Sequence, residues 1–319
     1  IYTLSLHDAL PISTSVSGSS VANVCTTGMF TIPLMKSVGY RPYFAGAVEA
    51  VASTGGQIMP PVMGAGAFIM AQFLGVGYLE VAIAAIVPAL LYYFAVIVQV
   101  HFEANRLGLK GLSRDQLPKL SRLLKEKGFL LIPLVAIVYL LIAGYTPLMA
   151  AYWGIWVSFF LSWLNRETRL TPRRLMEAFE AGARGALSVA CACACVGMVV
   201  GMGTLTGLAL RIAGAIVTLA GGKLILTLFF TMCASILLGT GLPTTANFIV
   251  TSTMAAPALL QLGVPAIAAY MFVFYFGIAA DLTPPVALAA YAGAGIAGDD
   301  PMKTGAEVEI GRASCRERV

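Results

Sequence analysis

The sequence predicts an all-α polytopic membrane protein with two structural repeats, each a re-entrant helical hairpin followed by a discontinuous transmembrane helix. Hydrophobic residues make up 59% and charged residues 11% of the 319 residues, and the mean hydropathy is +0.86. Soluble domains carry about 25% charged residues. The apolar residues run in blocks of roughly 17 to 25, long enough to cross a hydrocarbon core about 30 Å thick. The chain also aligns with itself at a fixed offset, which predicts the two repeats.

The two ends of the sequence are interpreted as artefacts. Back-translation of Thr3–Ile12 gives a DNA whose reverse complement, in a shifted frame, encodes most of Ile310–Val319. One sequencing adapter on opposite strands explains both ends. We therefore expect residues 1–13 and 309–319 to be adapter-derived and exclude them from fold reasoning, as for any cloning scar. The segment 299–308 is then a truncated native end.

The charges predict how the remaining chain is organised. Two hydrophilic loops, 103–128 and 165–185, hold seven and five basic residues. Basic loops flanking membrane helices mark the cytoplasmic side. We expect scaffold and connecting helices over 72–238, which includes both loops, between a first repeat at 14–71 and a second repeat at 239–298. The apolar segments lie at 43–71, 79–101, 129–145, 148–164, 186–221, 223–238 and 266–292.

The segment Thr171–Arg184 predicts an amphipathic helix along the membrane surface. It opens with a threonine suited to an N-cap, followed by Pro172, and its apolar residues recur at helical spacing. Cys191, Cys193 and Cys195 follow in an apolar run. In a helix Cys193 faces away from the other two, which favours small packing residues over a thiolate metal site.

The internal repeat is the most informative feature. A shift of 224 residues aligns the chain to itself without a gap, and nine of the 41 pairs between residues 22 and 62 are identical. The matches include Asn23 with Asn247 and Pro60-Pro61 with Pro284-Pro285, residues that shape the backbone. In lipid, broken backbone is tolerated only where it is buried in protein or lines a water-filled cavity. Paired interrupted segments in two repeats predict a transporter's midplane site.

The few intramembrane charges are candidates for function. Asp281 lies at the break of the second copy, where the first copy has Gln57. A carboxylate at that depth predicts a cation ligand or a proton carrier, with a buried basic partner as the alternative. Glu49 either lies in the membrane or pairs with Arg41. We expect Lys36 to extend its charged end toward the membrane surface.

Several segments resemble the large membrane subunit of tripartite ATP-independent periplasmic (TRAP) transporters. They are SGSSVANVCTTGMFTIPLMKSVGY, STGGQIMPPVMGAGAF, RRLMEAFEAGAR, GMGTLTGL, LLGTGLPTTAN and ADLTPPVALAAYAGAG, in that order. The resemblance covers about residues 14–308 and is strongest to the branch in which small and large subunits are fused and the partner is a TAXI-type solute-binding protein. It implies an elevator-type, Na⁺-coupled importer in the bacterial inner membrane. An extracytoplasmic binding protein would deliver a small organic anion, and no cofactor is implied beyond the coupling ion.

The resemblance also implies where the ligands bind. The cation residues would be Ser19, Ser20, Asn23, Ser53, Thr54, Gly55 and Gly56 in one site, and Gly239, Thr240, Thr244, Thr245, Asn247, Asp281 and Thr283 in the other. The substrate would lie between the two hairpin tips, against Ser20, Asn23, Pro60, Pro243, Thr244 and Pro284. Hydroxyl, amide and carbonyl oxygens suit Na⁺, and freed amides at helix starts can hold an anion. The alternative is that these small residues only let helices pack closely.

Other hypotheses stay open from the sequence. A binding-protein-independent Na⁺/dicarboxylate-type elevator symporter would have the same hairpins. An intramembrane enzyme using Asp281 or Glu49 is disfavoured because neither HExxH nor GxSxG accompanies them; we predict no catalytic residue. A passive assembly subunit would leave the polar tips unexplained. If the repeats are inverted, the segment 185–222 has to cross the membrane twice or otherwise change the parity.

Overall fold

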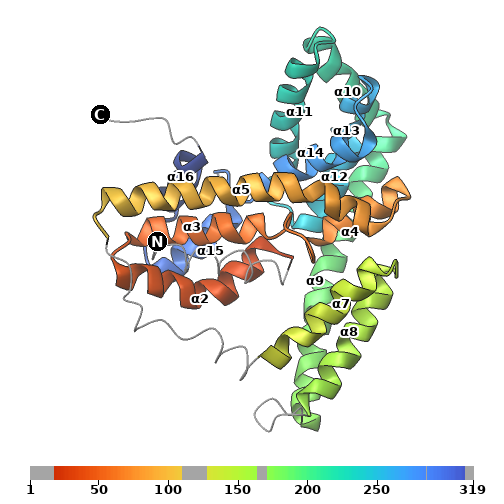
Figure 1. The fold of residues 1–319 in the computed structure, drawn as a ribbon. Helices are drawn as coiled ribbons and strands as arrows, with labels where there is room; N and C mark the ends of the chain where they lie inside the picture. Colours follow the sequence, from red (N-terminus) through yellow and green to blue (C-terminus); the bar gives the residue numbers. More distant parts are fainter. Residues whose placement is uncertain (1–17, 110–127, 164–170, 285, 313–319) are drawn as a thin grey trace.

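A computed structural model of the protein describes residues 18–109, 128–163, 171–284 and 286–312 (Figure 1). The regular elements of these residues are all helical, in agreement with the predicted all-α class. In chain order they are α2 (Ser20–Val38), α3 (Pro42–Gly55), α4 (Ala65–Leu74), α5 (Tyr78–Arg106), the 3-10 turn η2 (Gly128–Leu131), α7 (Ile132–Ile142), α8 (Pro147–Ser162), α9 (Pro172–Leu205), α10 (Leu208–Leu219), α11 (Leu224–Gly239), α12 (Thr244–Met254), α13 (Ala256–Gln261), α14 (Ala266–Ala279), α15 (Leu288–Ala297) and α16 (Pro301–Arg312).

Local sequence signals explain several helix ends. α2 ends at Gly39, whose φ of 111° lies in a region that only glycine adopts without strain, and its counterpart Gly263 (φ 77°) follows α13. α9 begins as predicted, with Thr171 as N-cap and Pro172 in the first turn. It then continues unbroken to Leu205. The amphipathic segment is therefore the first part of a longer helix and not a separate one, because no proline interrupts the helix-forming residues that follow it.

The 224-residue offset also relates the bounds of the helices. Adding 224 to the bounds of α3 gives 266 and 279, which are the bounds of α14. The same shift places α4 within one residue of α15 and places α2 on 244–262, which α12 and α13 cover. Among the described residues, the two non-glycine positions with positive φ are Met63 (57°) and Ala287 (32°), again 224 apart. Since side chains disfavour this region, the two breaks share an unusual backbone path.

The helices of the two repeats pack in an exchanged arrangement (Figure 1). α3 packs against α2, α15 and α16, whereas α14 packs against α12, α4 and α5. α15 contacts α2, and its counterpart α4 contacts α12. Each broken helix thus places its second half beside the first half of the other one. α5 runs along both groups, in contact with α3 and with α14. The contacts of α3 with α2, α15 and α5 recur as the contacts of α14 with α12, α4 and α5, as for a pseudo-two-fold pair, whereas α11 beside α14 has no counterpart among the described residues.

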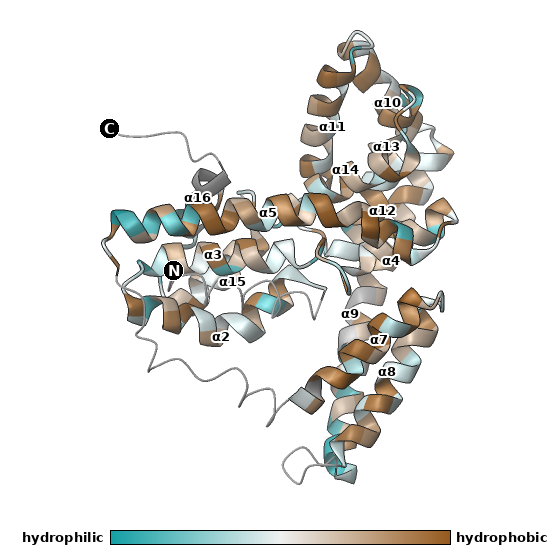
Figure 2. Ribbon diagram, viewed as in Figure 1, coloured by the Kyte–Doolittle hydropathy of each residue, from teal (hydrophilic) through white to brown (hydrophobic). Residues whose placement is uncertain are grey.

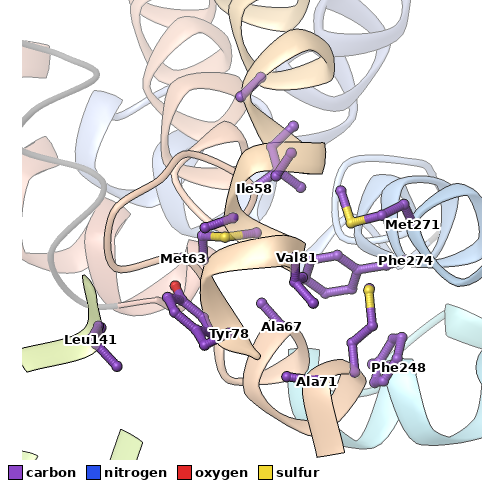
Figure 3. Packing of buried hydrophobic residues seen from close by; sticks show 14 of the residues in the cluster. Ile58, Met63, Ala67, Ala71, Tyr78, Val81, Leu141, Phe248, Met271 and Phe274 are labelled. Atoms are coloured by element: carbon purple, nitrogen blue, oxygen red, sulfur yellow. The ribbon is translucent and has the colours of Figure 1, made fainter. Parts of the chain in front are cut away.

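The core beneath the first break joins both repeats (Figure 3). Met63 from the break, Tyr78 of α5, Phe248 of α12 and Phe274 of α14 belong to one buried cluster. The Tyr78 hydroxyl donates to the carbonyl oxygen of Pro61 over 2.9 Å. The break lacks regular helical hydrogen bonds, and these side chains hold its backbone in place.

Most described helices are shorter than a single membrane crossing. By length and composition α5 can cross alone, and the last part of α9 together with α10, bent by 70° at their junction, counts as one broken span at most. That bend falls inside the segment 185–222, for which the sequence leaves the number of crossings open. The predicted crossings at 129–145, 148–164 and 223–238 contain apolar helices of 11, 16 and 16 residues (Figure 2). The assignment of the chain to a membrane rests on its apolar composition and not on helix length alone.

The expectations for the adapter-derived ends and for the cysteines of α9 can be compared with the described residues. α16 reaches Arg312 and so enters the segment 309–319 that the sequence assigns to an adapter; residues 1–13 lie outside the described part. On α9, Cys193 is half-buried, whereas Cys191 and Cys195 are exposed, so the predicted packing against this chain is partial at Cys193 and not seen at the other two. Within the described ranges no group of three His, Cys, Asp or Glu residues is placed to hold a metal ion.

Candidate functional site

The two broken helices stop at equivalent points of their repeats. After α3, the amide of Gln57 donates to the Thr54 carbonyl over 3.1 Å, and after α14 the amide of Asp281 donates to the Ile278 carbonyl over the same distance. Pro60 and its repeat counterpart then interrupt the helix, because proline has no N–H to donate. The last carbonyls of α3 and α14 therefore lie beside the breaks without their usual helical partners. The breaks bring carbonyl-rich helix ends and the starts of α4 and α15 into the interior.

The tip of the first hairpin reaches the break of the second repeat. Ser20, the first residue of α2, donates its hydroxyl hydrogen to Oδ2 of Asp281 over 2.8 Å. The two side chains are 1% and 4% exposed. Gln57 is buried beside the same carboxylate, but its amide atoms make no hydrogen bond of good geometry. The resemblance places Ser20 and Asp281 in different cation sites, whereas the structure joins them where the repeats meet.

Asn247 ties the second hairpin to α14. Its Nδ2 donates to the carbonyl oxygen of Gly277 over 2.7 Å. A Cβ atom on Gly239 or on Gly277 would come within 2.7 or 2.8 Å of the Asn247 amide, so a larger residue at either position would displace that amide. The Oδ1 atom of Asn247 is buried and makes no hydrogen bond. It is an oxygen acceptor at the second tip, of the kind that a cation site needs.

The other predicted residues surround these contacts. The hydroxyls of Thr54, Thr240 and Thr283 donate to carbonyls one turn earlier in the chain, over 2.9, 2.8 and 2.9 Å, which leaves their lone pairs available. Asn23, Ser53, Gly55, Gly56, Gly239 and Thr244 are buried, Ser19, Thr245, Pro60 and Pro284 are partly exposed, and Pro243 is exposed.

Glu49 is a buried polar group to which the sequence assigns no site. It lies on α3 with 0% exposure. Thr27 and Thr31 of α2 donate to Oε1 and Oε2, over 2.5 and 2.6 Å, and Ser53 lies one turn further along α3, 3.3 Å from Oε1. The signal for this network is the run of polar residues at positions 23, 27 and 31. It predicts one polar stripe on α2, but it does not identify the partner helix.

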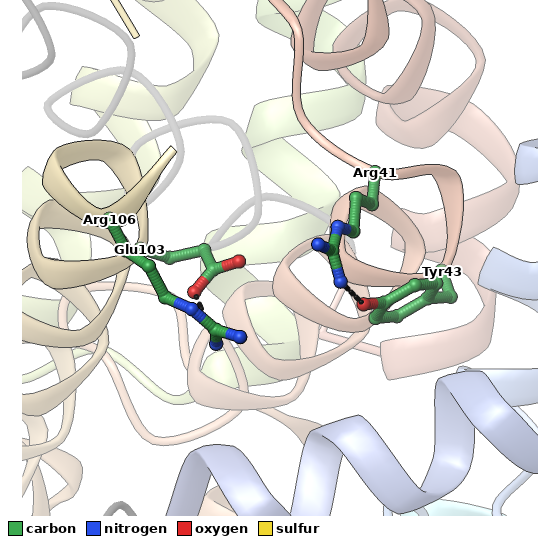
Figure 4. A network of polar contacts seen from close by, with 4 residues as sticks. All are labelled: Arg41, Tyr43, Glu103 and Arg106. Carbon is green, nitrogen blue, oxygen red and sulfur yellow. Dashed lines mark hydrogen bonds and ion pairs between the residues drawn. The ribbon is translucent and has the colours of Figure 1, made fainter. Parts of the chain in front are cut away.

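The charged residues at the end of the first hairpin bond neutral groups, as Figure 4 shows for Arg41. Arg41 donates to the hydroxyl of Tyr43 over 2.8 Å, and the structure does not show the pair with Glu49 that was one of the two alternatives. The Nζ of Lys36 donates to the carbonyl oxygen of Ala297 at the end of α15 over 2.7 Å. The ion pairs among the described residues lie elsewhere, on α5 and α9, and include neither Glu49 nor Asp281.

Comparison with known proteins agrees with the resemblance. Residues 10–314 match the family model described as "Tripartite ATP-independent periplasmic transporter, DctM component". The chain is 25% identical over 297 residues to the isethionate TRAP transporter permease protein DctMQ of Oleidesulfovibrio alaskensis. That alignment covers 89% of this chain and 44% of the relative, so the chain spans less than half the length of that relative. The match to the family model extends beyond the range 14–308 that the resemblance covers, by a few residues at each end.

Proposed function

The chain belongs to the DctM family of tripartite ATP-independent periplasmic transporters, and from this premise we propose that it is the permease core of a secondary active importer that couples a small organic anion to Na⁺. We place it in the bacterial inner membrane. Its proposed partners are an extracytoplasmic binding protein of the TAXI type and a small membrane subunit fused to the full-length chain. The family is one of transporters, which argues against the intramembrane enzyme hypothesis.

The observation that carries the proposal is the buried contact between Ser20 and Asp281. It joins the tip of one hairpin to the broken helix of the other repeat across a sequence separation of 261 residues. A carboxylate at membrane depth marks an ion pathway by default. The same contact lies where the two repeats meet, and this position supports a ligand site there, since transporters built from such repeats bind their ligands at the repeat interface.

The surrounding helix ends supply both signs of charge. The N-termini of α2, α4, α12 and α15 lie at the tips and breaks, and helix N-termini stabilise anions through their free amides. The C-termini of α3 and α14 end at the same breaks, and unwound carbonyls of this kind coordinate Na⁺ in other transporters. The proposed ligands are the first-tip, second-tip and break residues that the resemblance assigns. The relative's name, isethionate permease, supports an organic anion as the substrate.

Uptake by proteoliposomes tests the proposal. The full-length permease would be reconstituted with its cognate binding protein and an inward Na⁺ gradient, and isethionate and small carboxylates would be offered. We expect uptake to require both Na⁺ and the binding protein. Uptake that persists without the binding protein would favour the binding-protein-independent symporter instead. Absence of uptake, with Na⁺ failing to protect either hairpin from cysteine labelling, would exclude the cation sites.

Two substitutions then test the tips. Ser20→Ala removes the hydrogen bond to Asp281, and Thr244→Ala removes the equivalent hydroxyl of the second repeat. We expect each to raise the half-saturating Na⁺ concentration. Ser37→Ala and Thr253→Ala are matched controls, because these hydroxyls bond only to carbonyls of their own helices. Equal effects at tips and controls would count against the proposed ligands.

A further inference from the structure

We propose that Glu49 is a positioning residue for the cation site of the first repeat: it orients the Ser53 hydroxyl so that the Ser53 oxygen faces the cation, and it places a negative charge one helical turn behind that oxygen. This inference rests on the proposed function, since it takes Na⁺ as the coupling ion. It assigns to Glu49 a role that neither its sequence position nor its repeat counterpart indicates.

The geometry around Glu49 supports an acceptor role. Three hydroxyls are turned toward its two carboxylate oxygens, from Thr27, Thr31 and Ser53. A hydroxyl has one hydrogen and two lone pairs. When Ser53 donates that hydrogen to Glu49, both lone pairs of its oxygen point elsewhere, and a cation at the end of α3 is the group that they suit.

The threonines fix the carboxylate from the opposite side. Thr27 also lies 2.7 Å from the carbonyl of Asn23, and Thr31 lies 3.1 Å from the carbonyl of Thr27, so both hydroxyls are held against α2. Glu49 is thereby bound to two rigid points on α2. Its reach toward Ser53 is set by the distance between α2 and α3, not by a free rotation of its side chain.

The second repeat lacks the carboxylate and most of the hydroxyls that surround Glu49 in the first. At the equivalent positions Glu49 becomes Val273, Thr31 becomes Ala255 and Ser53 becomes Gly277. Thr251, the counterpart of Thr27, still bonds the carbonyl of Asn247 over 2.9 Å. The carboxylate and two of its three donors are absent together, and the one threonine that is kept bonds a carbonyl of its own helix. This pattern is expected when the hydroxyl donors are there to bind the carboxylate, and when the carboxylate has a role in the first repeat only.

The charge of Glu49 has no opposite charge beside it among the described residues. Arg41 bonds Tyr43, and Lys36 bonds the end of α15. The low dielectric around a buried carboxylate makes its attraction for a nearby cation stronger than in water. A cation held by the Ser53 oxygen and the carbonyls at the end of α3 would be the counter-charge.

The test is the Na⁺ dependence of uptake by the full-length permease carrying Glu49→Gln. Glutamine keeps the shape and removes the charge. We expect the half-saturating Na⁺ concentration to rise about tenfold, which corresponds to about 1.4 kcal/mol. The maximal rate at saturating Na⁺ should stay within about twofold, because a positioning residue changes binding more than turnover.

A double-substitution cycle shows whether Glu49 acts through Ser53. If it does, the double variant Glu49→Gln, Ser53→Ala shows a smaller effect than the sum of the two single effects, since the two share one interaction, and the part that remains reports the charge. Additive effects would overturn the inference. A wild-type permease whose uptake ignores Na⁺ would instead overturn the proposed function, so the two failures are distinguishable.

Two further variants separate positioning from a purely structural link between α2 and α3, and they serve if Glu49→Gln does not fold. Glu49→Asp shortens the side chain and draws the carboxylate away from Ser53, whereas Thr31→Val removes a donor on the other side and leaves the Ser53 contact. We expect only Glu49→Asp to raise the half-saturating Na⁺ concentration. Equal shifts for both variants would mean that Glu49 merely joins the helices.

Discussion

The first repeat buries its carboxylate in the first half of its broken helix, against α2, and the second repeat buries its carboxylate at the break. Glu49 corresponds to Val273, and Asp281 corresponds to Gln57. The backbones of the two repeats nevertheless match in helix bounds, in their positive-φ residues and in the way their halves exchange partners. The comparison teaches that the duplicated scaffold is symmetric while its buried charge is not. Two cation sites built on it should therefore differ in affinity.

The largest expected effect concerns the break of the second repeat. Asp281→Asn keeps the shape of the side chain and removes its charge. We expect the rate of uptake to fall about 100-fold, because a hydrogen bond to a buried charged group contributes about 1.5 to 3 kcal/mol. Initial rates in proteoliposomes measure this. Asp299→Asn, just after α15, is the matched control, since that carboxylate is partly exposed and bonds only a neighbouring amide.

The same break can test whether the repeats are equivalent. A double variant, Gln57→Asp with Asp281→Gln, moves the carboxylate to the first repeat. We expect it to stay inactive, because Ser20 would lose its charged acceptor. Recovery of uptake to near the unsubstituted rate would show that the two breaks are interchangeable, which would contradict the asymmetry.

A smaller effect is expected at the two places where the first half of one broken helix crosses the second half of the other. α3 and α15 meet at Gly46 and Gly293, where a Cβ on Gly293 would lie 2.6 Å from the Gly46 carbonyl oxygen. The equivalent crossing of α14 and α4 has Tyr270 and Ile69, both packed against the core. The first crossing is thus a close backbone approach, whereas the second has large side chains at the equivalent positions. Small residues allow this kind of close helix approach in membranes.

Gly293→Ala should destabilise the permease by about 2 to 3 kcal/mol, because backbone on both sides cannot yield and overpacking costs energy of this order. Thermal unfolding in detergent measures the change. Gly295→Ala on the same helix is the control: no atom lies within 4 Å of its Cβ, so it should stabilise by about 0.5 to 1 kcal/mol. If the two substitutions behave alike, the crossing is not a backbone contact.

The smallest effect concerns the end of the first hairpin. Lys36 bonds the last carbonyl of α15, whereas its counterpart Leu260 has no charge to offer. Lys36→Met should lower the free energy of unfolding by about 0.5 to 1 kcal/mol, the usual worth of a cation at a helix C-terminus. Lys36→Arg should retain part of the stabilisation that the cation provides at the end of α15. A loss in Lys36→Arg as large as in Lys36→Met would assign the effect to packing.

Much of the fold could be predicted from the sequence because its signals are local. Hydropathy predicts the membrane class, the prolines at 60 and 284 predict the breaks, and Pro172 predicts the start of α9. Each acts on its own stretch of chain, through hydration, a missing N–H or a fixed φ. The tertiary arrangement was harder to predict from the sequence. Polar residues at helical spacing on α2 predict a buried face, but not that Glu49 would meet it.

The sequence by itself determined that this protein is a duplicated membrane transporter with two interrupted helices, because hydrophobic runs and backbone-shaping residues recur at one offset. Only the tertiary structure decided which halves pack together and which polar groups meet. The contacts of Ser20 with Asp281 and of Lys36 with Ala297 each join residues 261 positions apart. Such contacts follow from how whole helices pack in three dimensions, and no local spacing encodes them.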